Sequence, residues 1–124
     1  MVTEFCKGGD LQNYMMNRDY EALDEETVKK FALSLGEGIR YLHDRNIVHR
    51  DIKPENILMS GVNSIATPIL ADFEYAKLLT EKNTCSRLCG TKGYMAPEIL
   101  AEKPYALPVD IWAFGTLIYA LVSS

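Results

Sequence analysis

The strongest hydrophobic pattern in the chain has the period of an α-helix. Between residues 24 and 45, apolar side chains recur every three or four positions and define one buried face. Asp24 stands at the start as an N-cap, and the two glutamates that follow it suit the positive end of a helix dipole. The pattern predicts a long amphipathic helix that ends near Asp44. Its apolar positions are Val28, Phe31, Ala32, Leu35, Ile39 and Leu42.

A second helical segment, residues 108–122, is apolar on nearly every side. A helix with that pattern belongs in the middle of a larger protein, so Trp112 is expected in the core. The segment is shorter than the roughly 20 residues that a membrane-spanning helix needs. Phe114, Leu117 and Leu121 are expected to need cover from later helices that this chain does not contain.

The other regular elements are predicted to be short. Residues 1–6 form a candidate strand that enters a turn at Gly8 and Gly9, after which Asp10 caps a helix through about Arg18. A long loop with one turn of helix is expected over residues 74–107. Short β-like runs occupy residues 47–48, 57–59 and 69–71. The predicted fold class is mainly α with short β-hairpins.

Composition narrows the function classes only slightly. The 124 residues are enough for one domain, and the net charge of -4 argues against general nucleic-acid binding. The three cysteines include no CxxC pair and are expected to be reduced thiols. No signal-peptide pattern is visible, so an intracellular location is expected, with cytoplasm and nucleus left open.

One polar segment between two β-like runs carries most of the candidate chemistry. Residues 49–56 read HRDIKPEN and place a carboxylate, an ammonium and a carboxamide, those of Asp51, Lys53 and Asn56, within six residues. A carboxylate can accept a hydroxyl proton, an ammonium can neutralise phosphate charge, and an amide oxygen can bind Mg²⁺. Asp72 follows the next β-like run and is a candidate for a second metal ligand.

Four motifs in order give the chain a family resemblance. It is similar, over essentially its whole length, to the C-terminal lobe of a eukaryotic-type serine/threonine protein kinase. The resemblance implies that lobe in incomplete form, with no N-terminal lobe and no final helices. The motifs are HRDIKPEN at 49–56, DFE at 72–74, APE at 96–98 and DIWAFG at 110–115. The implied segments are a hinge at 1–10, a long helix at 24–45, a catalytic-loop region at 47–59, an activation segment at 72–98 and a central buried helix at 108–122.

The resemblance implies an enzyme that transfers the γ-phosphoryl group of ATP to a serine or threonine of a protein substrate, with Mg²⁺ as cofactor. Asp51 would be the catalytic base, and Lys53 would stabilise the transferring phosphoryl group. Asn56 and Asp72 would hold the magnesium ions. The expected partners are ATP and the protein substrate, with no nucleic acid and no membrane span.

The resemblance also assigns an adenine-binding hinge to the N-terminal residues. Thr3 would be the gatekeeper, and the backbone of Glu4 and Cys6 would hydrogen-bond the base. Asp10 would reach the ribose or a basic substrate residue, and Leu58 would lie under the adenine ring.

Further residues would have structural roles in such a lobe. His49 would stack beneath Phe73, and Asp110 would hold the catalytic-loop backbone. Thr91 would lie in the substrate-docking loop close to Asp51 and Lys53. Glu98 would belong to the motif that closes the activation segment. His43 is interpreted as a helix-end side chain, and Cys89 as a packing residue.

Arg50 is a candidate regulatory residue. In loop-regulated kinases this arginine pairs with a phosphate on the activation segment, and the candidate acceptors here are Thr84 and Ser86. An exposed loop without a phosphosite is the open alternative, because Arg87 occupies the place where some relatives have the threonine.

Two departures from the family pattern keep other functions open. Glu74 replaces the glycine that usually follows Asp-Phe, which restricts the backbone and adds a negative charge near the metal ligands. The glycine-rich loop and the strand lysine of a complete kinase are not found in the sequence. The chain is therefore expected to be a fragment that is inactive alone. The alternatives are a catalytically impaired kinase-like scaffold that binds partners, or a partial gene product.

Overall fold

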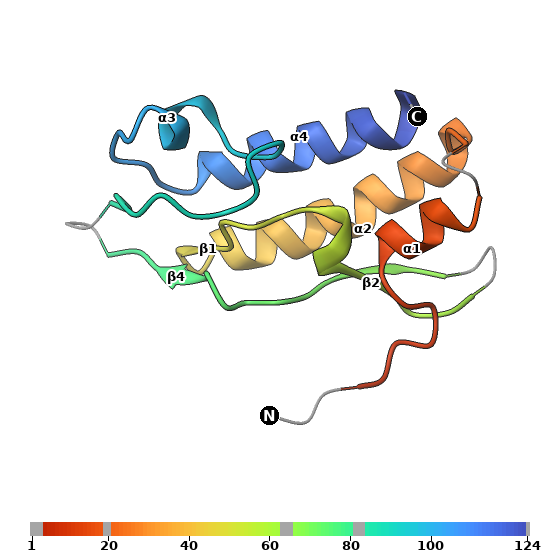
Figure 1. Ribbon diagram of the computed structural model, residues 1–124. Coiled ribbons are helices and arrows are strands. Elements are labelled where there is room, and N and C mark those ends of the chain that lie inside the picture. The colour runs from red at the N-terminus through yellow and green to blue at the C-terminus, as the bar shows by residue number, and fades with distance from the viewer. Residues whose placement is uncertain (1–3, 19–20, 63–65, 81–83, 124) are drawn as a thin grey trace.

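The computed structural model describes residues 4–18, 21–62, 66–80 and 84–123. Figure 1 shows the two long helices, α2 and α4, side by side, with the short strands along the other side of α2. The helices are α1 (Leu11–Met16), α2 (Glu25–His43), α3 (Pro97–Leu100) and α4 (Pro108–Ser123), and η1 (Pro54–Asn56) is a 3₁₀ turn. The strands are β1 (Ile47–Val48), β2 (Ile57–Met59), β3 (Pro68–Leu70) and β4 (Lys77–Leu78).

Helix α2 begins and ends where its sequence pattern indicates. The Asp24 carboxylate accepts hydrogen bonds from the Thr27 N–H at 3.0 Å and the Thr27 hydroxyl at 2.6 Å, which satisfies the first turn of the helix and lowers the pKa of Asp24. Asp44 is the C-cap. The face that points into the core is formed by Val28, Phe31, Leu35, Ile39 and Leu42.

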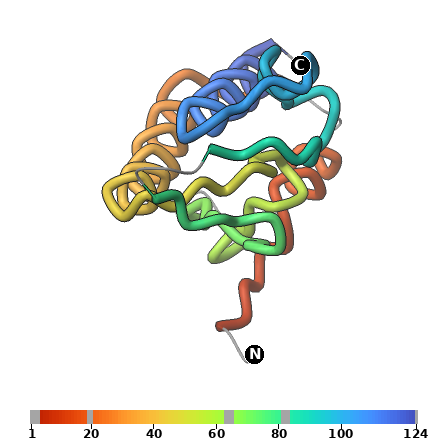
Figure 2. Tube along the Cα trace, turned by 90° about the vertical axis from the view of Figure 1, so that its left-hand side faces the viewer, coloured from red at the N-terminus to blue at the C-terminus, as the bar shows by residue number. Residues whose placement is uncertain are grey.

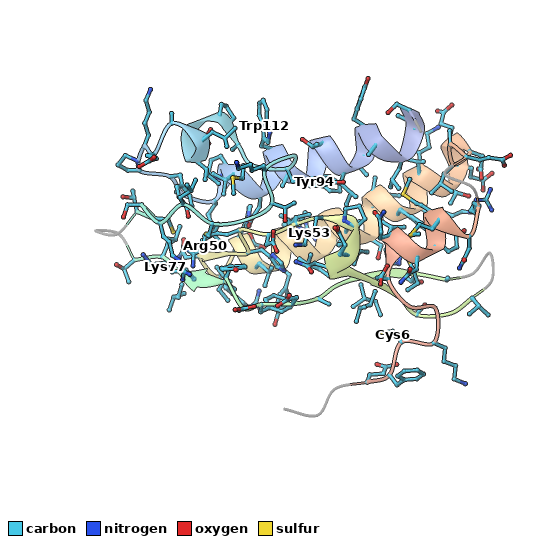
Figure 3. The ribbon with its side chains drawn as sticks, viewed as in Figure 1. Cys6, Arg50, Lys53, Lys77, Tyr94 and Trp112 are labelled. Atoms are coloured by element: carbon cyan, nitrogen blue, oxygen red, sulfur yellow. The ribbon has the colours of Figure 1, made fainter. Side chains whose placement is uncertain are left out.

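Helix α4 corrects two expectations from the sequence. Leu117 and Leu121 are 0% exposed, because they pack in one core with the buried face of α2, so they need no cover from outside the chain. Trp112 is 52% exposed, so its expected core position is wrong. In Figure 3 its side chain points away from α2. The face of α4 that is turned toward α2 is buried. Because α4 is apolar on all sides, apolar residues also lie outside that face, and Ile111 and Tyr119 remain exposed with Trp112. No helix in the described ranges is both long and apolar enough to cross a membrane.

Two small antiparallel sheets lie at either end of the polar segment 49–56. Strand β2 pairs with β3, with Ile57 opposite Leu70. Strand β1 pairs with β4, with Ile47 opposite Leu78, so this sheet is not a hairpin, because β2 and β3 come between its strands in the sequence. Strand β4 falls inside the region predicted as loop. Residues 4–6 form no strand, and the rest of the strand predicted at 1–6 lies outside the described residues.

The segment before α1 is attached to β2 through its backbone. The Gly8 N–H donates to the Met59 carbonyl at 3.0 Å, and the Met59 N–H donates to the Gly9 carbonyl at 2.8 Å. A Cβ atom on Gly8 would lie 2.1 Å from the Gly61 carbonyl oxygen, so only glycine fits this contact. The described residues before it extend away from the body of the molecule (Figure 2).

Candidate active site

The backbone at the start of the polar segment 49–56 is held by one buried carboxylate. Asp110, on α4, is 1% exposed and accepts the His49 N–H and the Arg50 N–H, each at 2.8 Å. The second bond supports an unusual backbone conformation, because Arg50 has a φ of 74°. His43 Nε2, on α2, lies 2.9 Å from Asp110 Oδ2. His43 is the last residue of α2, as the sequence indicated, and it also binds the same carboxylate.

His49 connects this loop to the residue before Asp72. Its Nε2 lies 3.0 Å from the Ala71 carbonyl oxygen, which can only accept, and its Nδ1 receives the Asp51 N–H at 3.3 Å. The ring is therefore the neutral Nε2–H tautomer. Burial lowers the pKa of His49, which agrees with that tautomer. Its ring meets Phe73 edge-on, with 5.0 Å between centroids, instead of stacking flat beneath it.

Asp51, Lys53, Asn56 and Thr91 form one hydrogen-bonded group. Asp51 Oδ2 lies 3.1 Å from Lys53 Nζ and accepts from Asn56 Nδ2 at 2.9 Å. Asp51 Oδ1 accepts from the Thr91 hydroxyl at 3.0 Å, and Lys53 Nζ donates to the same hydroxyl oxygen at 2.9 Å. The four side chains come from two segments about 40 residues apart. A base, a cation and a threonine hydroxyl thus meet at one place.

Asp72 is placed beside this group by the backbone of the preceding residue. The Ala71 N–H donates to the Asn56 carbonyl at 2.9 Å, while the Ala71 carbonyl binds His49. Asp72 itself is exposed, has a φ of 58°, and accepts the Glu74 N–H at 3.2 Å. Glu74 is exposed, and its φ is not in the left-handed region. This conformation therefore does not use the freedom that a glycine would give at position 74.

The oxygen atoms of Asn56 and Asp72 are suited to a hard cation. Asn56 Nδ2 donates to both the carboxylate and the carbonyl of Asp51, at 2.9 Å each, so its Oδ1 is the atom left to accept. Among the described residues no three His, Cys, Asp or Glu side chains gather into a metal cage. Magnesium fits such a sparse donor set, because it usually takes one or two protein oxygens and completes its shell with water and substrate phosphates.

The residues predicted for the hinge are only partly brought to the site. Thr3 lies outside the described residues. Glu4 is exposed and Cys6 is half-buried on the N-terminal segment, away from Lys53 (Figure 3). Asp10 and Leu58 meet through an antiparallel β-bridge. The Asp10 carboxylate caps α1 by accepting the backbone and side-chain N–H groups of Asn13, each at 2.7 Å.

The candidate phosphate acceptors, Thr84 and Ser86, are exposed. Arg50 Nε donates to the Tyr75 carbonyl at 2.5 Å, and Lys77 Nζ lies 3.4 Å from the Thr84 carbonyl. Glu98, at the start of α3, is half-buried in an apolar groove beside α4.

Nothing in the sequence indicated the contacts that two residues make around this site, the half-buried His43 and the buried Tyr105. His43 is 67 positions from Asp110, and no local pattern signals that pairing. Tyr105 is 4% exposed and contacts the segment 85–89, but it stands outside every motif in the sequence.

Comparison with known proteins defines the class of this chain. Residues 1–124 match the protein kinase domain, and the chain belongs to this family.

Three curated relatives are similar over nearly all of the chain. A serine/threonine-protein kinase ATG1b of Arabidopsis thaliana is 40% identical over 123 residues, which are 99% of this chain and 17% of the relative. An inhibitor of nuclear factor kappa-B kinase subunit alpha of Xenopus tropicalis is 38% identical, again over 99% of this chain and 17% of the relative. The serine/threonine-protein kinase ULK1 of Homo sapiens is 38% identical over 96% of this chain and 12% of the relative. The chain thus spans a small part of the length of each.

Proposed function

We propose that the protein containing this chain is an ATP-dependent serine/threonine protein kinase, and that the chain forms part of its C-terminal lobe. Family membership and kinase relatives support the reaction class. In this proposal residues 1–10 are the hinge, 47–59 the catalytic-loop region, 72–98 the activation segment and 108–122 the central helix. The observation that carries it is one hydrogen-bonded group, in which Asp51 and Lys53 bind the Thr91 hydroxyl and Asn56 binds Asp51.

The proposed chemistry gives each of these side chains a part. A substrate serine or threonine oxygen forms a new bond to the γ-phosphorus of ATP, the bond to the bridging oxygen breaks, and ADP leaves. Asp51 accepts the hydroxyl proton, which a carboxylate within hydrogen-bond reach can do. Lys53 places a positive charge where the phosphoryl group carries negative charge. Two bonds from Asn56 hold Asp51 in place.

Asn56 and Asp72 would hold magnesium in this proposal. The ion would supply charge neutralisation on the nucleotide phosphates. The chain's own contribution is the position of Asp72, which follows from the two backbone bonds of Ala71 to Asn56 and His49.

The remaining roles belong to the same proposal. The Glu4 and Cys6 backbone and Leu58 would meet the adenine base, with Thr3 as gatekeeper, and Asp10 would exchange a bond to Asn13 for the ribose or for a basic substrate residue. A phosphate on Thr84 or Ser86 would draw the Arg50 guanidinium from the Tyr75 carbonyl, since a phosphate is the stronger acceptor.

Phosphate transfer from labelled ATP to a serine- or threonine-bearing protein tests the proposal. The purified protein should require Mg²⁺, and Asp51→Asn should lower turnover by at least about 100-fold while nucleotide binding persists. Asp44→Asn makes the same change at an exposed helix cap and should have no effect. Full activity in Asp51→Asn would remove the assigned base. Absence of turnover in a wild-type protein that still binds Mg-ATP would favour the scaffold alternative.

A further inference from the structure

Tyr105 is a buried residue without a role in the proposed reaction. It lies between α3 and α4 and is 4% exposed. Its backbone pairs with that of Cys85, because each N–H donates to the other residue's carbonyl at 2.8 Å. This pair joins the segment before α4 to the middle of the proposed activation segment.

The Tyr105 hydroxyl makes two further contacts with the same segment. It donates to the Arg87 carbonyl at 2.6 Å and lies 3.4 Å from Cys89 Sγ. A hydroxyl has one proton, and the Arg87 carbonyl can only accept, so the Cys89 thiol is the donor in the second contact. Burial, followed by the hydrogen bond with Cys89, raises the pKa of Tyr105 to about 12, so the hydroxyl keeps its proton at neutral pH.

The segment held by Tyr105 leads directly to the proposed base. Gly90 follows Cys89 with a φ of 105°, and a Cβ atom there would lie 2.7 Å from the Arg50 carbonyl oxygen. Thr91 comes next and binds Asp51 and Lys53. Residues 85–91 are thus fixed at one end by Tyr105 and at the other by the catalytic-loop region.

We propose that the Tyr105 hydroxyl is a positioning group that holds residues 85–89, so that Thr91 stays on Asp51 and Lys53. The positioning follows from the contacts alone. Its consequence for the reaction rests on the proposed kinase function, in which Thr91 lies in the substrate-docking loop.

Alkylation of the three cysteines by iodoacetamide, followed by mass spectrometry, tests the positioning. In Tyr105→Phe the ring and the backbone pair with Cys85 remain, whereas the bonds to Arg87 and Cys89 are lost. A thiol is a weak donor, so the loss of the bond to Arg87 dominates and should raise the rate at Cys89 by about fivefold through local opening. The rates at Cys85, which is 0% exposed, and at the half-exposed Cys6 should stay unchanged.

Tyr119→Phe is the matched control, because it removes the same hydroxyl from a side chain that is 70% exposed, and it should change no rate. An unchanged rate at Cys89 in Tyr105→Phe would overturn the proposal. So would equal increases at Cys85 and Cys89 with a lower melting temperature, because that result means a packing role alone.

Kinetics provide the second readout in a protein with turnover. Tyr105→Phe should raise the KM for the protein substrate by about fivefold, the same factor expected for the lost bond, and leave the KM for ATP unchanged. Equal effects on both constants, or none, would refute the link to the reaction. A wild-type protein without turnover would refute the kinase function, while the cysteine rates would still decide the positioning.

Discussion

Asp110→Asn should strongly destabilise the protein, although it changes only one atom of a side chain far from the surface. Both carboxylate oxygens of Asp110 accept a backbone N–H, and one of them also lies 2.9 Å from His43 Nε2. An amide at this position has only one acceptor oxygen. Its NH₂ group would face either the His49 N–H or the Arg50 N–H, and both are donors.

The expected cost follows from the bonds that are lost. A hydrogen bond to a charged group contributes about 1.5–3 kcal/mol, and a buried donor left without an acceptor costs about 1–3 kcal/mol. Asp110→Asn should therefore lower the free energy of unfolding by about 2–3 kcal/mol. Asp110→Ala, which leaves both N–H groups without an acceptor, should cost about 3–5 kcal/mol. Those losses are a large part of a typical stability of about 5–15 kcal/mol.

Urea denaturation, with the midpoint and slope fitted together, measures both variants. Asp44→Asn is the control, since Asp44 is exposed and its change should stay within about 0.5 kcal/mol. The reasoning fails if either Asp110 variant changes the free energy of unfolding by less than about 1 kcal/mol, because even one buried N–H group cannot lose its acceptor at that cost.

Two further predictions concern stability. Burial lowers the pKa of His49 below its ordinary 6.5, so as the pH falls the unfolded chain binds the extra proton first. The free energy of unfolding should therefore fall as pH drops below about 6.5, by up to about 1.4 kcal/mol per pH unit from this group. In denaturation experiments from pH 7.5 to 5.5, the free energy of unfolding should depend less on pH in His49→Phe than in the wild type, and an equal dependence would contradict the neutral tautomer. Gly8→Ala should lower the free energy of unfolding by about 1–3 kcal/mol, because its Cβ would lie 2.1 Å from the Gly61 carbonyl oxygen. Gly38→Ala, in α2 with nothing within 4 Å of its Cβ, should raise it by about 0.5–1 kcal/mol. Melting temperatures of the two variants that shift in the same direction would refute both predictions.

The sequence predicted well what local periodicity controls. Helix α2 was predicted from its apolar period and from Asp24, and both are properties of neighbouring residues. The closeness of Thr91 to Asp51 was predicted from the family resemblance, and the two side chains lie 3.0 Å apart. Neither periodicity nor composition contained that contact.

The predictions from the sequence that failed, and the contacts that it did not indicate, involve partners that are distant in sequence. Apolar residues on all sides of α4 predicted burial for Trp112, but burial depends on which elements cover that face, and α2 covers the other one. His43 has a favourable position at the end of α2 in any fold, so nothing local indicated that it binds Asp110, 67 positions away. Strand β4 is two residues long and exists only through its pairing with β1.

The aspartates 51, 72 and 110 differ in what surrounds them, and those surroundings limit what each can do. Asp110 is 1% exposed with both oxygens bonded to backbone N–H groups, so it can hold a loop but cannot reach a substrate. Asp72 is exposed, with one backbone donor on its carboxylate, so it is open to a cation from solvent. Asp51 is 6% exposed, and the Thr91 hydroxyl lies 3.0 Å from its Oδ1. The Thr91 hydroxyl, which is of the same chemical type as the substrate hydroxyl in the proposed reaction, already lies between this carboxylate and Lys53. A substrate serine or threonine must therefore share the Asp51 Oδ1 atom with Thr91 or displace Thr91 from it. The contacts of Tyr105 with residues 85–89 would limit how far Thr91 can move away.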